Sequence, residues 1–137
     1  MSVTAKKIAT ILRCVERARD EYAQAGTAFK QNFTRQDAAV LNVTRACEAA
    51  IDLANMLVRK QRLGVPGDTR ESFSLLERGG LIPAELSGRL QRMIGFRNVA
   101  VHQYQELDLD IVEAVIRDGL ADLLRFAEDV RPHLSGV

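Results

Sequence analysis

The chain has 137 residues and a mass of 15.2 kDa, so we expect a single domain over residues 1–137. Hydrophobic residues make up 47% of the sequence and charged residues 27%, which excludes a disordered, collagen-like or disulfide-framework protein. The net charge is +1, so any contact with a nucleic acid must come from a local basic patch rather than from the field of the whole protein.

The first half of the chain carries the spacing of two long helices. Apolar residues recur three and four positions apart over residues 6–22, as one buried helix face requires. Thr34, with Asp37 three positions later, forms an acidic variant of the N-capping pattern and predicts that a second helix begins there. The apolar stripe of this helix fades near Arg62. The segment 64–67, Gly-Val-Pro-Gly, then predicts a loop, because glycine and proline disfavour helix continuation.

The second half predicts one short helix and two longer ones. The short helix covers residues 71–78 and is ended by the glycine pair that follows it. Pro83 suits the first turn of the next helix, and Asp108 or Asp110 is a candidate cap for the last one, which should end near Pro132. No run alternates with a period of two, so no strand is predicted. The predicted fold class is all-α: a single-domain helical bundle of four main helices plus a short one.

Arg97 breaks the apolar pattern of the fourth predicted helix. The apolar stripe of that helix consists of Leu86, Leu90, Met93 and Val101. At ~100° per residue, Arg97 projects from the centre of this stripe. An unpaired guanidinium is costly inside a core, so it must be paired or used. Glu48, Asp52 and Asn55 flank the stripe of the second helix and could pair with it, which is the structural alternative to a functional role.

His102 and Tyr104 follow Arg97 closely in the sequence. On a continuous helix, His102 would point roughly 140° away from Arg97, so the two side chains converge only if the helix ends or bends near residues 99–101. Histidine can give or take a proton near neutral pH, although a lone histidine is more often structural or exposed than catalytic. The other histidine, His133, lies beyond the last predicted helix, and we expect it to be exposed.

A ten-residue segment at this point resembles a known signature. It reads Gly95-Phe96-Arg97-Asn98-Val99-Ala100-Val101-His102-Gln103-Tyr104. The segment is similar to the Arg-x4-His-x-Tyr motif of the HEPN superfamily, specifically of the HepT-like ribonuclease toxins. Members of that family are small helical bundles with the motif near a helix end and a long final helix after it, as predicted here. The resemblance implies the toxin component of a type VII-like toxin–antitoxin pair.

The resemblance implies RNA cleavage without a metal ion or other cofactor. The sequence holds no His, Cys and carboxylate cluster at metal-ligand spacing. Such cleavage needs a base, an acid and a cation that stabilises the charge on phosphorus. Arg97 fits the cationic role because its planar guanidinium can donate hydrogen bonds to two phosphate oxygens at once, and His102 fits the acid or the base. Asn98 is a supporting residue that would orient the phosphate or His102. Because one imidazole is awkwardly placed for both proton transfers, we expect the composite homodimer site for which the family is known.

Tyr104 has two interpretations. In the resembled family, this tyrosine is the target of the partner antitoxin, a minimal nucleotidyltransferase that attaches AMP to it. A phosphate placed beside Arg97 would fill the anion site and add bulk, so inhibition by AMP is physically reasonable. The alternative is a packing residue that closes the final loop, since a buried tyrosine commonly keeps its polar end hydrogen-bonded.

Other functional classes stay open at this point. A non-catalytic helical module would bind a nucleotide or a nucleotidyltransferase and cut nothing, while a plain structural bundle would leave Arg97 unexplained. Charges interrupt every apolar stretch, so we expect no contact with a membrane. Cys47 is expected in the core and Cys14 at the edge of a helix stripe, and their spacing fits a reducing cytoplasm. The basic cluster at residues 59–62 is interpreted as a solvated surface.

Overall fold

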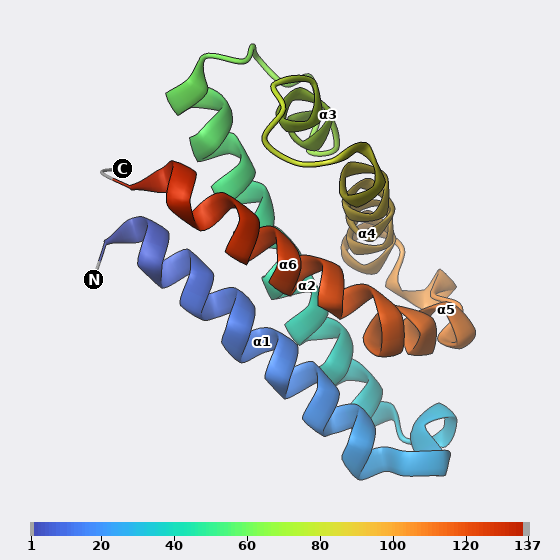
Figure 1. Ribbon diagram of the computed structural model, residues 1–137. Coiled ribbons are helices and arrows are strands. Elements are labelled where there is room, and N and C mark those ends of the chain that lie inside the picture. Colours follow the sequence, from blue (N-terminus) through green and yellow to red (C-terminus); the bar gives the residue numbers. More distant parts are fainter. Residues whose placement is uncertain (1, 136–137) are drawn as a thin grey trace.

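The computed structural model describes residues 2–135, and the regular elements among them are all helical (Figure 1). The two longest, α1 (Val3–Ala25) and α2 (Phe33–Gln61), lie side by side in opposite directions. A short 3-10 helix at Gly26–Gln31 joins them. Gly26 has a φ of 56°, a left-handed angle that favours glycine, and so ends α1. The predicted all-α class is confirmed.

The start of α2 differs from the prediction. Asn32, and not Thr34, is its N-cap, since the Asn32 side-chain oxygen accepts a hydrogen bond of 3.0 Å from the backbone N–H of Arg35. A cap has to precede the first helical residue with an extended backbone, whereas Thr34 already lies inside the first turn. The predicted capping role of Thr34 and Asp37 is therefore wrong, and the Asp37 carboxylate is available for a different contact.

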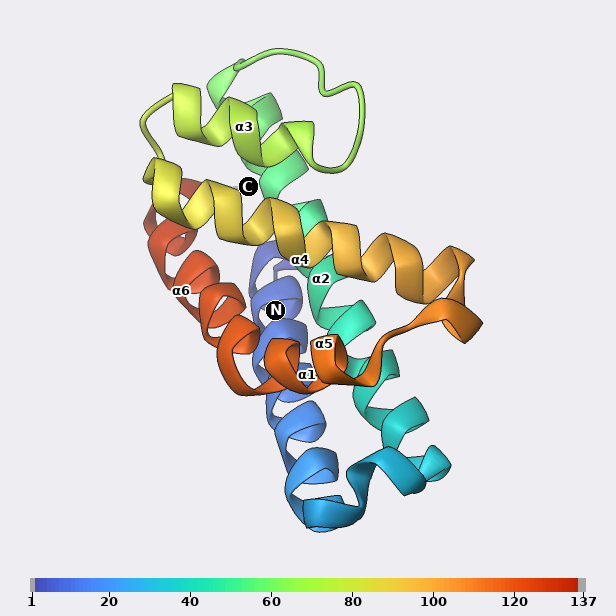
Figure 2. The same cartoon turned by 90° about the vertical axis from the view of Figure 1, so that its right-hand side faces the viewer.

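The middle of the chain follows the prediction closely. The segment 64–67 lies in the loop after α2, and α3 (Glu71–Arg78) has the predicted bounds. Gly80, with a φ of 76°, makes the turn that follows. Helix α4 (Ala84–His102) begins directly after Pro83. Figure 2 shows α4 crossing over α2, with α3 beside the first half of α4.

The last predicted helix is one continuous run with an irregular turn. It consists of α5 (Leu109–Ala114), a π-helical turn (Val115–Gly119) and α6 (Leu120–Val130). Asp108 is the cap, because its carboxylate accepts a hydrogen bond of 2.8 Å from the backbone N–H of Asp110. The run ends just before Pro132, as predicted.

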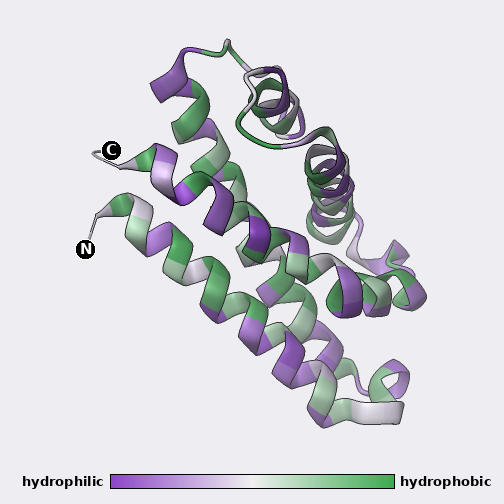
Figure 3. Cartoon of the chain, in the orientation of Figure 1, coloured by the Kyte–Doolittle hydropathy of each residue, from purple (hydrophilic) through white to green (hydrophobic). Residues whose placement is uncertain are grey.

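The core forms where α6 packs against α1, α2 and α4. Phe73 of α3 and Phe126 of α6 are fully buried and meet edge to face, with ring centroids 5.3 Å apart. Gly119 permits the close approach of α4, since an added Cβ there would lie 2.7 Å from the sulfur of Met93. Figure 3 shows hydrophilic and hydrophobic positions on the same helices, as amphipathic packing requires. Across residues 2–135, no helix has the length and apolar character of a membrane span.

Both cysteines are free thiols inside the bundle. Cys47 lies in the core, as predicted. Cys14, which the sequence placed at the edge of the apolar stripe of α1, is also fully buried. The reason is that both α2 and α6 pack against α1. Burial raises the pKa of the Cys47 thiol to about 12, since a thiolate would lose its hydration there.

Candidate functional site

One end of α4 carries the predicted site. Arg97, Asn98 and His102 lie in the last two turns of this helix. Tyr104 opens the short 3-10 helix Tyr104–Glu106 that follows. All four residues are therefore on one short stretch of chain, and contacts with α2 hold the side chains of Arg97 and Tyr104.

The end or bend near residues 99–101 that Arg97 and His102 would need in order to converge does not occur in α4. The backbone N–H of Gln103 still bonds to the carbonyl of Val99 at 2.8 Å, so the helix continues unbroken to His102. This regular last turn keeps Arg97 and His102 roughly 140° apart around the axis. A single chain thus does not meet the condition for bringing the guanidinium and the imidazole to one point.

Arg97 turns towards α2 and is largely buried, with 20% of its side chain exposed. Its Nη2 lies 3.7 Å from Glu48 Oε1, and its Nη1 donates a hydrogen bond of 3.0 Å to Asn98 Oδ1. The Nε is buried and has no hydrogen-bond partner among residues 2–135. Pairing with an acid of the second helix is confirmed for Glu48, whereas Asp52 pairs with Lys7 at 2.7 Å.

Asn98 and His102 lie further round α4, on its solvent side. Asn98 is half-buried and its side-chain oxygen accepts a hydrogen bond from Arg97, so it orients the guanidinium, and among residues 2–135 it forms no hydrogen bond with His102. His102, the last residue of the helix, is exposed and accessible to a ligand or to another protein. His133 is exposed as well, as predicted.

Tyr104 is anchored on the start of α2. Its hydroxyl donates a hydrogen bond to the carboxylate of Asp37, 67 positions away in the sequence. Burial of the hydroxyl, together with the Asp37 carboxylate, raises the pKa of Tyr104 to about 12, so the phenol stays protonated at neutral pH. The residue is still 43% exposed and borders a pocket of about 410 Å³ that also includes the exposed ring of Phe33. Tyr104 therefore closes the loop and also remains accessible.

Asp37 is the residue at this site that the sequence analysis misses. Sequence spacing links Asp37 to Thr34, three positions away, and nothing local links it to Tyr104. The contact arises because α2 and the end of α4 are packed together. The sequence signal for this contact is a carboxylate near the start of α2 that the helix does not need as a cap, because Asn32 caps it.

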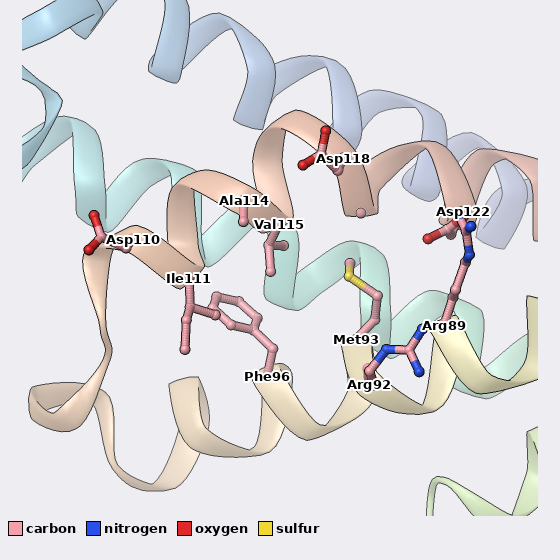
Figure 4. Close-up of a pocket in the computed structure, with 11 residues that line it drawn as sticks. Arg89, Arg92, Met93, Phe96, Asp110, Ile111, Ala114, Val115, Asp118 and Asp122 are labelled. Carbon is pink, nitrogen blue, oxygen red and sulfur yellow. The ribbon is translucent and has the colours of Figure 1, made fainter.

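A different cavity opens between α4 and the α5–α6 run. It has a volume of about 520 Å³ and an apolar lining that includes Met93, Phe96 and Val115 (Figure 4). Arg89 reaches across one end of it to Asp122, at 3.7 Å. Among the residues that the structure describes, none of the four predicted site residues lines this cavity. It is therefore separate from the site at the end of α4.

The site thus offers a cation, a proton-exchanging imidazole and an accessible phenol. Within residues 2–135, no group of three or more His, Cys, Asp or Glu side chains could hold a metal ion. Arg97 can bind an oxyanion through the donors that the loose pair with Glu48 leaves free. His102 can exchange a proton with a bound group.

Comparison with known proteins gives one consistent result. The family model described as Ribonuclease HepT-like matches residues 11–130. The mRNA nuclease HepT of Shewanella oneidensis is 49% identical over 125 residues, which are 91% of this chain and 93% of that protein. A solved structure of a tri-AMPylated Shewanella oneidensis HEPN toxin in complex with MNT antitoxin has a TM-score of 0.90 and 45% identity, covering 96% of this chain and 98% of that chain. A toxin–antitoxin crystal structure with AMP-PNP has a TM-score of 0.89 and 45% identity, with 96% and 99% covered.

These similarities extend over nearly the whole bundle, including the segment that carries Arg97, His102 and Tyr104. They confirm the resemblance noted on that segment. They also decide against a non-catalytic binding module and against a plain structural bundle, because the matched family is one of nucleases. The chain belongs to the Ribonuclease HepT-like family, and its activity is that of a ribonuclease.

Proposed function

We propose that this ribonuclease acts as a two-fold homodimer in which Arg97 and His102 of both copies form one RNA-cleaving cleft. The observation that supports the proposal is the unbroken end of α4, on which the two side chains point roughly 140° apart. RNA cleavage requires the cation and the proton-exchanging groups around a single phosphate. A second copy, related by a two-fold axis, can supply from its own α4 what one chain lacks.

The surface that would pair the two copies is the α2–α4 face, which we define by Leu41, Glu48, Arg97 and Val101. Leu41 and Val101 are apolar, yet they are 47% and 45% exposed. A partner that covered them would also dehydrate Arg97 and strengthen its attraction for a phosphate. Met93, which the sequence places on this face, is 4% exposed and fills the space between α4 and α6, so it does not contribute to an interface.

The chemistry follows from the residues that such a cleft would hold. One His102 takes the proton of a ribose 2′-hydroxyl, and that oxygen attacks the adjacent phosphorus. The second His102 gives a proton to the 5′-oxygen that leaves, so the products are a 2′,3′-cyclic phosphate and a 5′-hydroxyl. The Arg97 guanidinium stabilises the charge that develops on the phosphoryl oxygens. The substrate class is mRNA, as in the relative from Shewanella oneidensis.

Regulation is proposed to act through Tyr104. A nucleotidyltransferase antitoxin transfers AMP from ATP to its hydroxyl and releases pyrophosphate, in line with the tri-AMPylated relative that was solved in complex with MNT antitoxin. The accessible phenol and the pocket beside it support this assignment. The added phosphates bring negative charge and bulk two residues from His102, where they compete with RNA for the cleft.

Mixed dimers test the composite site directly. Wild-type and His102→Ala chains carry two different affinity tags, are co-expressed, and the heterodimer is purified through both tags. If both imidazoles serve one cleft, the heterodimer loses nearly all RNA cleavage. If each chain holds its own site, the heterodimer keeps about half of the wild-type rate, and the proposal is wrong. A wild-type dimer carrying both tags is the control.

A further inference from the structure

A polar pocket lies on the outer side of α4, away from the pocket of Tyr104. It has a volume of about 650 Å³ and is lined by the loop before α3, by α3 and by α4. Each of these three elements contributes one arginine to it: Arg70, Arg78 and Arg92 respectively. Ser74 and Gln91 add neutral polar groups to the lining. The pocket therefore gathers three guanidinium groups from segments that are separate in the sequence.

The charges of these arginines are not neutralised by ion pairs. Among the ion pairs formed by residues 2–135, none includes Arg70, Arg78 or Arg92. The carboxylates of Asp68 and Glu71 also line the pocket, and Asp68 accepts the backbone N–H groups of residues 70 and 71 at 3.0 and 2.8 Å. Three guanidinium groups against two carboxylates leave the pocket with a net positive charge, which attracts anionic ligands.

The outer face of α4 connects this pocket with His102. Gly88, Gly95 and His102 are seven positions apart, so they follow one line along the helix with a drift of ~20° per step. A Cβ added at Gly88 would lie 3.8 Å from the Arg92 guanidinium, so an arginine of the pocket lies over this glycine. A Cβ added at Gly95 would lie 3.8 Å from the Arg70 guanidinium, so that arginine reaches the line itself. From Gly95 to His102 the distance along the axis is ~10 Å. Figure 2 shows this stretch of α4 between α3 and the helix end.

We propose that the pocket of Arg70, Arg78 and Arg92 binds backbone phosphates of the RNA substrate, to one side of the bond that is cut at His102. This inference rests on the proposed function, because it takes the end of α4 as the place of cleavage. The planar guanidinium of arginine can donate two hydrogen bonds to phosphate oxygens, and Arg70 and Arg92 lie over the two glycines on the line that leads to His102. These arginines contact no reacting atom, so they hold the substrate and leave the chemical step to Arg97 and His102.

RNA binding by charge-removed variants tests the inference. The probe is a fluorescent single-stranded RNA, and all proteins carry His102→Ala so that the RNA stays intact. In the pocket variant, Arg70, Arg78 and Arg92 are replaced by Gln. In the matched control, the same change is made at Arg13, Arg17 and Arg19, which are exposed on α1. We expect the pocket variant to bind at least ~10-fold more weakly and to flatten the slope of log K against log salt by about 2, at about 0.7 per lost phosphate contact.

Two further measurements separate the possible outcomes. With His102 intact, the pocket variant should raise KM for RNA and leave kcat near wild type, and Arg→Lys replacements at the three positions should restore most of the binding. Equal affinities and salt slopes for the pocket and α1 variants overturn the inference. So does a pocket variant that binds RNA normally and fails to co-purify with the antitoxin, since the pocket would then serve the protein partner.

The proposed function can fail separately from this inference. If the wild type binds RNA through the pocket and a heterodimer with His102→Ala keeps half of the activity, the composite cleft is wrong and the pocket stands. If the heterodimer is inactive and the pocket variant behaves as the α1 control does, the cleft stands and the pocket assignment is wrong.

Discussion

Arg97 and Glu48 lie 3.7 Å apart on the α2–α4 face, near enough to attract each other but too far apart for a good hydrogen bond. Asn98 holds the Arg97 guanidinium from the other side at 3.0 Å. The Arg97 guanidinium is thus oriented, but not all of its N–H groups are used in hydrogen bonds, so some remain available to a phosphate. A tightly paired arginine would have to lose its partner before it could bind RNA.

This geometry predicts different effects for the two partners. Arg97→Lys is expected to lower kcat about 100-fold or more, because a lysine lacks the fork that binds two phosphoryl oxygens. Glu48→Gln should change cleavage by less than about threefold and the free energy of unfolding by less than ~1 kcal/mol, because a half-exposed ion pair contributes little. Initial cleavage rates measure the change in activity of each variant, and chemical denaturation measures the change in its free energy of unfolding. A loss in Glu48→Gln as large as that in Arg97→Lys would place Glu48 in the chemistry.

Replacing His102 should separate activity from stability. The residue is exposed at the end of α4, so His102→Ala is expected to leave the melting temperature near wild type while RNA cleavage is lost. His133→Ala is the matched control, since His133 is also an exposed histidine, and it should cleave as wild type does. Cleavage by His102→Ala at the wild-type rate would show that His102 is neither the acid nor the base.

Tyr104 is expected to be the point of regulation. Burial and the Asp37 carboxylate raise its pKa to about 12, so at neutral pH its phenol is a donor and not a base for the 2′-hydroxyl. Tyr104→Phe should therefore keep cleavage activity and escape AMP attachment by the antitoxin. Tyr22→Phe removes the other tyrosine, which bonds to Glu113 at 2.8 Å, and should still be modified.

Mass spectrometry of each variant co-expressed with the antitoxin decides this prediction. AMP on a residue other than Tyr104 would refute the assignment. Complete neutralisation of the toxin without any modification would show that the antitoxin acts by covering the cleft.

The dimer should depend on the apolar part of the α2–α4 face. Light scattering is expected to give twice the 15.2 kDa mass of one chain. Leu41→Asp and Val101→Asp should shift the mass to one chain and abolish cleavage, because each places a charge in the interface. Leu12→Asp is the control, since Leu12 is 43% exposed on α1 and outside this face. A wild-type protein that scatters as a single chain at micromolar concentration would refute the composite site.

The cap of α2 makes a prediction about stability. Asn32→Ala should lower the free energy of unfolding by about 1 kcal/mol, because the N–H of Arg35 loses its acceptor. Thr34→Ala should be nearly neutral, because Thr34 is exposed within the first turn. Denaturant unfolding of the two variants compares them. If Thr34→Ala lowers the free energy of unfolding more than Asn32→Ala does, Thr34 is the cap, as the sequence pattern suggested.

Most helices of this protein can be predicted from short stretches of sequence. The bounds of α3, the start of α4 after Pro83 and the cap at Asp108 depend on residues within a turn or two. The error in the cap of α2 is also local. Asn32 and Thr34 are both good capping residues, and the sequence pattern does not show which of them precedes the first helical residue. The buried position of Met93 depends instead on the neighbouring helix, where Gly119 leaves room for it.

The sequence by itself determined the all-α class, the order of the helices and the family, and the spacing of Arg97, His102 and Tyr104 made them candidate site residues. Only the tertiary structure decided what these residues contact: Glu48 holds Arg97, Asp37 holds Tyr104, and an unbroken α4 turns His102 towards solvent. The physical reason is that helix periodicity and caps are local, whereas the position of α2 against α4 results from the burial of apolar side chains spread along the whole chain.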